Sequence, residues 1–105
     1  MGLLNIVNSY LSKESTKLLY SEATKLYQEG NYDLAKQKLS KLLELEPENK
    51  KAFILLKLTT TQKLILEKKY KEAKSELFEA IKVEPENEEV LELLKKIDTL
   101  LELNE

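Results

Sequence analysis

The sequence predicts an all-α protein built from antiparallel helical hairpins, and two observations carry this expectation. The segment from Glu29 to Asn49 recurs as the segment from Glu67 to Asn87, and the two copies align over their whole length without a gap. Each copy also carries apolar residues at helical spacing, followed by a proline two residues before its end. Self-similarity at this period is typical of stacked helical repeats. Nine residues of the first copy return 38 positions later: Glu29, Tyr32, Ala35, Lys36, Leu39, Glu46, Pro47, Glu48 and Asn49.

Composition favours one small domain without catalytic chemistry. The 105 residues include neither Cys nor His, so thiolate and imidazole metal sites and the commonest catalytic bases are missing. With Gly2 and Gly30 as the two glycines, no Gly-rich phosphate loop is available. All 17 basic residues are Lys and the net charge is −2, which is not typical of a nucleic-acid binder. We therefore expect no enzyme, no cofactor and no nucleic-acid partner.

The duplicated segment resembles the second helix of a tetratricopeptide repeat. That family places an aromatic residue at the helix start, then Ala, a large apolar residue and a closing Pro. The first copy fills these places with Tyr32, Ala35, Leu39 and Pro47, and the second with Tyr70, Ala73, Leu77 and Pro85. The resemblance implies a short right-handed α-solenoid with a concave groove that binds proteins or peptides.

The start of the chain, 1–15, is predicted to form an N-terminal helical segment. Its apolar stripe is Leu3, Leu4, Ile6, Val7, Tyr10 and Leu11. Ser12 to Thr16 is the expected break, because Ser and Thr favour helix caps; one long helix from Leu3 to Glu29 is the alternative. The stripe either caps the first repeat or docks on a partner or a membrane surface. Residues 1–11 do not read as a secretory signal, and no apolar run is long enough to span a membrane, so we expect a cytoplasmic protein.

Two hairpins should follow, with repeat one at 16–49 and repeat two at 50–87. In repeat one, Gly30-Asn31 marks the turn before a helix from Tyr32 to Leu45. The spacing between the two prolines exceeds the usual repeat length of the family by about one helical turn, which indicates one extra turn in the helix from Lys50 to Lys68. Thr59-Thr60-Thr61 on that helix is either a close-packing seam or a polar patch in the groove. The loop at Lys68-Lys69 lacks the Gly of the first copy, so we expect a different turn there.

The last part of the chain, 88–105, is predicted to be a capping helix with its ordered part from Glu88 to Leu103. Asn87 is a candidate N-cap. The apolar surface is wide for a cap, which suggests self-association, including a possible homodimer. The residues expected to take part are Leu93, Leu100, Leu101 and Leu103.

The resemblance also implies which side chains line the groove. In repeat one these are Lys17, Tyr20, Ser21, Thr24, Tyr27 and Gln28, and in repeat two Thr59, Gln62 and Lys63. The family's clamp for the C-terminal carboxylate of heat-shock chaperones is absent, because Tyr20, Thr24 and Thr59 stand at its positions. We therefore expect a non-catalytic adaptor or assembly factor that binds a peptide or helix. Self-association is one alternative, and a membrane-surface tether through residues 1–11 is another, although membrane binding is not favoured.

Overall fold

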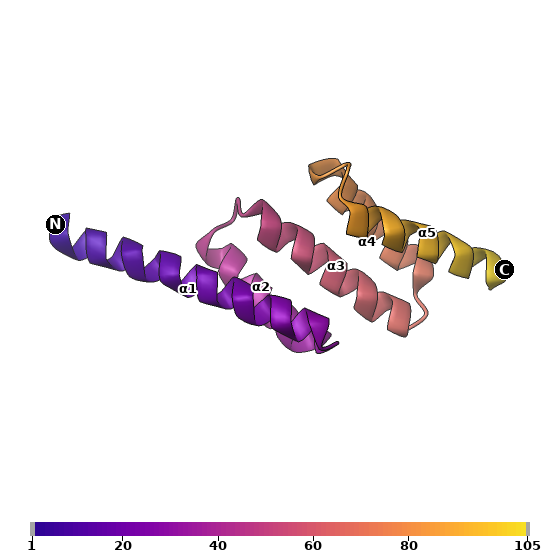
Figure 1. The fold of residues 1–105 in the computed structure, drawn as a ribbon, viewed down its shortest axis with the longest axis horizontal. Coiled ribbons are helices and arrows are strands. Elements are labelled where there is room, and N and C mark those ends of the chain that lie inside the picture. The colour runs from indigo at the N-terminus through magenta and orange to yellow at the C-terminus, as the bar shows by residue number, and fades with distance from the viewer. Residues whose placement is uncertain (1, 105) are drawn as a thin grey trace.

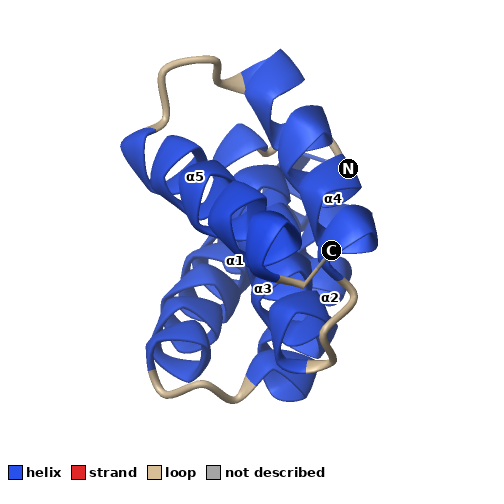
Figure 2. Cartoon of the chain, turned by 90° about the vertical axis from the view of Figure 1, so that its right-hand side faces the viewer, coloured by secondary structure: helices blue, strands red, loops and turns tan. Residues whose placement is uncertain are grey.

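Five helices make up the computed structural model: α1 (Gly2–Gln28), α2 (Tyr32–Leu45), α3 (Lys50–Leu66), α4 (Tyr70–Val83) and α5 (Glu88–Leu103). The structure describes the backbone of residues 2–104 and the side chains of residues 13–104. Helices α1, α3 and α5 lie side by side in an inner layer, and α2 and α4 form an outer layer behind it (Figure 1 and Figure 2). The all-α expectation is confirmed, because every regular element of residues 2–104 is a helix.

The two Glu-Pro-Glu-Asn segments build the same turn twice. Asn49 caps α3, since its side-chain Oδ1 accepts a hydrogen bond from the Ala52 N–H at 3.0 Å. Its Nδ2 donates to Glu46 Oε1 at 2.9 Å. Asn87 repeats both contacts at the start of α5, at 3.0 Å and 2.8 Å. The predicted N-cap at Asn87 is therefore confirmed.

The turns inside the two hairpins also match, which corrects the expectation of a different turn at Lys68-Lys69. Gly30 has φ +79° and Lys68 has φ +60°, so both occupy the left-handed region. The backbone N–H groups of Lys68 and Lys69 bond to carbonyls three and five residues back, as those of Gly30 and Asn31 do. The packing of the hairpin thus holds a lysine in a conformation that favours glycine.

Replacing Lys68 with glycine should stabilise the protein by about 0.5–1 kcal/mol. The left-handed conformation costs a Cβ-bearing residue roughly 1–2 kcal/mol, and the backbone entropy that glycine loses on folding offsets part of this gain. Gly30→Ala should have the opposite sign and a similar size; nothing lies within 4 Å of the added Cβ, so the cost is conformational alone. Urea unfolding of both variants measures the effect. Equal destabilisation by both would contradict the assignment.

The N-terminal segment and the first helix of repeat one form a single helix, so the expected break at Ser12 to Thr16 is wrong and the long-helix alternative holds. Thr16 is compatible with a helix interior because its Oγ1 lies 2.9 Å from the Lys13 carbonyl oxygen. The same hydroxyl lies 2.9 Å from Glu46 Oε2 at the end of the first hairpin. The N-terminal part of α1 extends beyond the other helices (Figure 1), and its expected docking role concerns side chains outside the described residues.

The contact between Thr16 and Glu46 gives a pH-dependent prediction. Hydrogen bonds from Asn49 and then Thr16 hold the pKa of Glu46 below its ordinary value of 4.5. A carboxyl group with a lowered folded-state pKa stabilises the fold above its unfolded value and loses that effect as pH falls through the folded pKa. The stability difference between the wild-type chain and Thr16→Val should therefore be constant above about pH 6 and shrink below about pH 4.5.

Urea unfolding at a series of pH values tests this prediction. Thr24→Val is the matched control, because the Thr24 hydroxyl donates to the Tyr20 carbonyl and not to a carboxylate. Its effect on stability should not change with pH. A Thr16→Val effect that is also independent of pH would show that the hydroxyl does not act through Glu46.

Helix α3 joins the two halves of the core. Its residues Ala52 and Leu55 are buried in a cluster with α1 and α2. Ile54 and Leu58 are buried in the other cluster, with α4 and α5. Thr59 and Thr61 are completely buried, and their hydroxyls donate to backbone carbonyls one turn earlier on α3. The close-packing interpretation of the threonine triplet is thus confirmed for two of its three residues.

Candidate functional site

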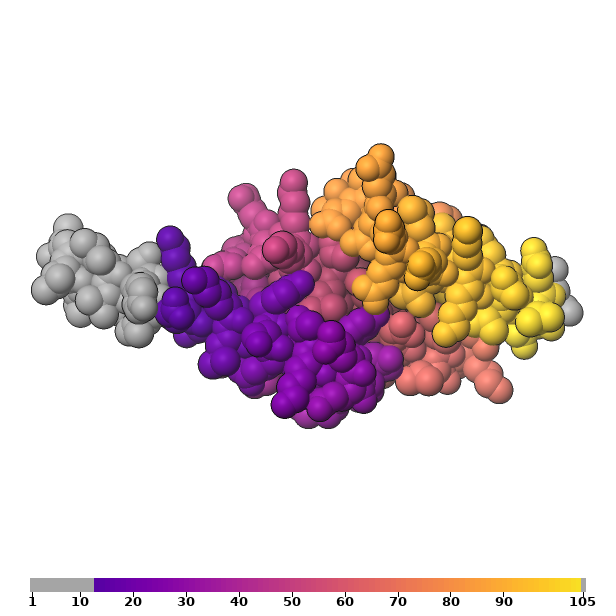
Figure 3. Space-filling model, viewed as in Figure 1, coloured from indigo at the N-terminus to yellow at the C-terminus, as the bar shows by residue number. Residues whose placement is uncertain are grey.

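A groove crosses the inner layer, which faces the viewer in Figure 3. Its volume is about 470 Å³. The floor comes from Ile54, Leu55 and Leu58 on α3, and the tyrosine rings of α1 stand beside it. In full, the groove residues are Tyr20, Thr24, Tyr27, Gln28, Lys51, Ile54, Leu55, Leu58, Glu84, Asn87 and Glu89.

Tyr27 forms a hydrogen bond that connects α1 to α5 across this groove. Its hydroxyl donates to Glu89 Oε1 at 2.7 Å and accepts a bond from Gln62 Nε2 at 3.5 Å. The centroid of its ring lies 5.9 Å from the centroid of the Tyr32 ring. Burial, together with the hydrogen bond to Glu89, raises the pKa of Tyr27 far above its ordinary value. The phenol therefore remains a neutral donor throughout the physiological range.

The sequence prediction for α1 corresponds well to the groove. Tyr20, Thr24, Tyr27 and Gln28 all line it. Lys17 lies outside it, in an adjoining hollow of about 400 Å³ that we call the lysine hollow. Its residues are Lys13, Thr16, Lys17, Tyr20, Glu46, Asn49 and Lys51, so it shares Tyr20 and Lys51 with the groove.

The predictions for α3 need correction. Thr59 is 0% exposed and cannot meet a ligand in this structure. Lys63 forms an ion pair with Asp33 on α2, which draws its ammonium group towards the outer layer. Gln62 lies at the groove edge through its contact with Tyr27. Successive helical residues point about 100° apart, so Thr59 and Lys63 each lie one residue past the groove face.

Sequence reasoning missed the groove residues that lie on α3 and around the start of α5. Apolar residues on a helix and acidic residues at a helix start are common in any helical protein, so neither type indicates a groove by itself. The internal repeat contained a signal for part of this set, since it places Leu58 at the position of Tyr20 and Lys51 at the position of Lys13. The missed residues are Lys51, Ile54, Leu55, Leu58, Glu84, Asn87 and Glu89.

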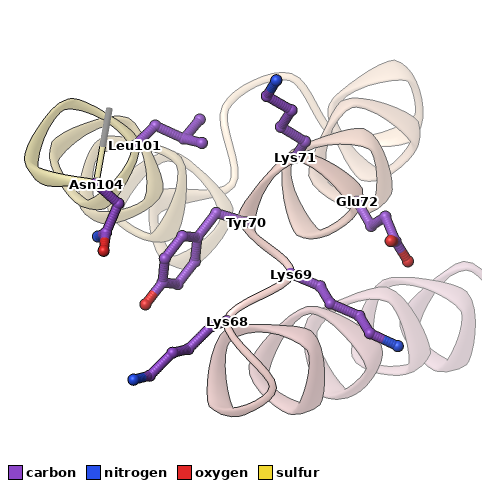
Figure 4. A pocket seen from close by; sticks show the side chains of 7 residues that line it. All are labelled: Lys68, Lys69, Tyr70, Lys71, Glu72, Leu101 and Asn104. Carbon is purple, nitrogen blue, oxygen red and sulfur yellow. The ribbon is translucent and has the colours of Figure 1, made fainter.

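A second hollow lies at the turn between α3 and α4, beside the end of α5. It contains Lys68, Lys69 and Lys71, together with Tyr70 and Leu101. Figure 4 shows the three lysine side chains pointing in different directions. Because their ammonium groups do not converge on one point, this hollow is a weaker candidate than the groove.

The acidic residues of the described structure do not form a metal centre. No group of three potential metal-binding side chains occurs within this part of the chain. Glu84 and Glu89 at the groove edge bond instead to Asn87 and Tyr27. The groove therefore offers apolar contact, hydrogen bonds and charge, which are the means of recognising another polypeptide.

Comparison with known families agrees with the hairpin architecture. A tetratricopeptide repeat family model matches residues 26–97, more than half of the chain. The chain belongs to the tetratricopeptide repeat family. Tetratricopeptide repeats generally mediate protein–protein interactions and are generally non-catalytic. Searches of curated proteins and of solved structures give no match.

The structure also locates the residues expected to drive self-association. Leu93 is 7% exposed and belongs to the core, so its inclusion was wrong. Leu100 and Leu101 are partly buried, whereas Leu103 is 76% exposed. None of the helices within the described residues is long and apolar enough to cross a membrane.

A double-mutant cycle on Tyr27 and Glu89 tests the bond across the groove. Tyr27→Phe and Glu89→Ala should each destabilise the fold, and their coupling energy should be about 0.5–1.5 kcal/mol, the contribution of one hydrogen bond. Urea unfolding of the four proteins gives this energy. Tyr32→Phe is the control, because the described residues offer its hydroxyl no hydrogen bond, and it should change stability by less than about 0.5 kcal/mol.

Proposed function

We propose that this protein is a non-catalytic adaptor or assembly factor of the cytoplasm, and that it binds a peptide or short helix of another protein in the groove. The observation that carries the proposal is the groove itself, which combines residues of all three inner helices. Half-buried tyrosines beside an apolar floor suit protein binding, since Tyr offers a large apolar body with a polar tip.

The ends of the stack also favour the groove as the binding surface. On α3, Ile54 and Leu58 pack against the second hairpin. The internal repeat places Glu92 and Lys96 at the equivalent positions of α5, and both are exposed. On α1, the positions equivalent to Ala52 and Leu55 are likewise polar and exposed: Glu14 and Lys17. We infer that, at these positions of the described residues, α1 and α5 are less suited than α3 to pack against a further hairpin, although Leu18 and Leu103 remain exposed on them.

Self-association is the second candidate. It is favoured by Leu103, whose side chain is the most exposed among the large apolar residues of the described chain. The partly buried Leu100 and Leu101 would join it. Light scattering coupled to size exclusion, over a concentration series, distinguishes monomer from oligomer. A mass that Leu103→Glu leaves unchanged would rule out this surface.

Binding in the groove can be tested with random peptides. Peptides displayed on phage are selected on the immobilised full chain, and the affinity of the enriched peptides is then measured by calorimetry. Tyr20→Ala should weaken their binding at least tenfold, since truncated aromatic anchors typically cost more than about 1.4 kcal/mol.

Phe78→Ala is the matched control, because this ring is 47% exposed on α4 in the outer layer. It removes an exposed aromatic residue away from the groove and should leave affinity unchanged. The proposal fails if the selected peptides lose affinity with Phe78→Ala and keep it with Tyr20→Ala. It also fails if no peptide is enriched over a surface without protein.

A further inference from the structure

The lysine hollow concentrates positive charge at one end of the groove. Lys13 and Lys17 come from α1, and Lys51 comes from the first turn of α3. Lys13 and Lys51 are equivalent positions of the internal repeat, on neighbouring inner helices. The repeat therefore places two lysines at matching positions of neighbouring inner helices, and Lys17 follows one turn along α1.

One glutamate, Glu46, lies among these lysines and interacts electrostatically with Lys13, so the hollow holds three positive charges to one negative charge. Glu46 already accepts hydrogen bonds at both carboxylate oxygens, from Asn49 and from Thr16, each at 2.9 Å. Lys17 has a carboxylate neighbour in Glu14, but the 3.7 Å pair is exposed and worth little. Lys13 and Lys51 form no ion pair with the carboxylates of the described residues.

The acidic edge of the groove differs, because its carboxylates already have partners inside the protein. Glu89 accepts the Tyr27 hydroxyl, and Glu84 accepts the Asn87 amide. These donors are neutral and leave both negative charges in place, so the excess of positive charge is confined to the lysine hollow. This arrangement is not a consequence of overall composition, since the chain has a net charge of −2.

We propose that the groove takes an acidic and apolar peptide segment, with a carboxylate side chain in the lysine hollow and apolar side chains over Tyr20 and Leu58. This inference rests on the proposed function of the groove and adds the chemistry of its ligand. Electrostatic complementarity of this kind selects partners and speeds their association. Three partly solvated charge contacts should favour the acidic ligand by roughly tenfold.

Three synthetic peptides serve as probes, with leucines at every third or fourth position and glutamate, lysine or glutamine at all others. Their binding to the full chain is measured by fluorescence anisotropy. The glutamate peptide should bind about tenfold more tightly than the glutamine peptide, and the lysine peptide most weakly. Raising the salt concentration from about 50 mM to about 300 mM should reduce the difference.

The triple variant Lys13→Gln, Lys17→Gln, Lys51→Gln should remove the preference for the glutamate peptide. Its matched control is Lys41→Gln, Lys69→Gln, Lys71→Gln, which makes the same charge change at exposed residues outside the groove and the lysine hollow. The control should keep the preference. Circular dichroism checks that both variants remain folded.

Tyr20→Ala separates failure of this inference from failure of the proposed function. If Tyr20→Ala weakens all bound peptides while the lysine variant leaves the preference unchanged, the groove binds peptides and the acidic specificity is wrong. If Tyr20→Ala has no effect on any of them, or if none of the peptides binds, both proposals are overturned. Equal binding of the glutamate and lysine peptides would also overturn the inference.

Discussion

The two halves of the core are held together by α3, which is buried on two of its faces. Ala52 and Leu55 pack towards the first hairpin, and Ile54 and Leu58 pack towards the second. A helix with one apolar stripe could join only one of these clusters. The groove follows from this arrangement, because its floor is the part of α3 that α1 and α5 leave open.

Exact repetition explains why so much of the fold could be predicted from the sequence. The Glu-Pro-Glu-Asn segments repeat a cap whose donors and acceptors all lie within a few residues, so local sequence suffices. Lys68 shows where such reasoning fails. It adopts the left-handed conformation and makes the same backbone hydrogen bonds as Gly30, although its Cβ disfavours that conformation. The break expected near Thr16 failed similarly, since its hydroxyl bonds within the helix and to Glu46.

The groove was predicted in part, and the prediction is better for α1, where Lys17 and Ser21 are the two expected residues that do not line it, than for α3. For α1 the family resemblance placed Tyr20, Thr24 and Tyr27 correctly, because that helix keeps the usual spacing to the turn. For α3 the expected positions included Thr59 and Lys63, each one residue beyond the groove face. One residue is a rotation of about 100°, enough to turn a side chain from the groove towards α2. An error of one residue in the alignment of a helix hardly changes the predicted fold, but it changes which side chains are predicted to line the groove.

The bond between Tyr27 and Glu89 connects the groove to the curvature of the whole stack. Tyr27 and Glu89 are 62 positions apart in the sequence, and their hydrogen bond joins the end of α1 directly to the start of α5. The packing between α1 and α5 otherwise runs through α2, α3 and α4 in turn, so the angle between them depends on four successive helix packings. A hydrogen bond across the inner face limits that angle directly. Tyr27 therefore has two roles in the structure, because it lines the groove and also bonds the two inner helices that border it.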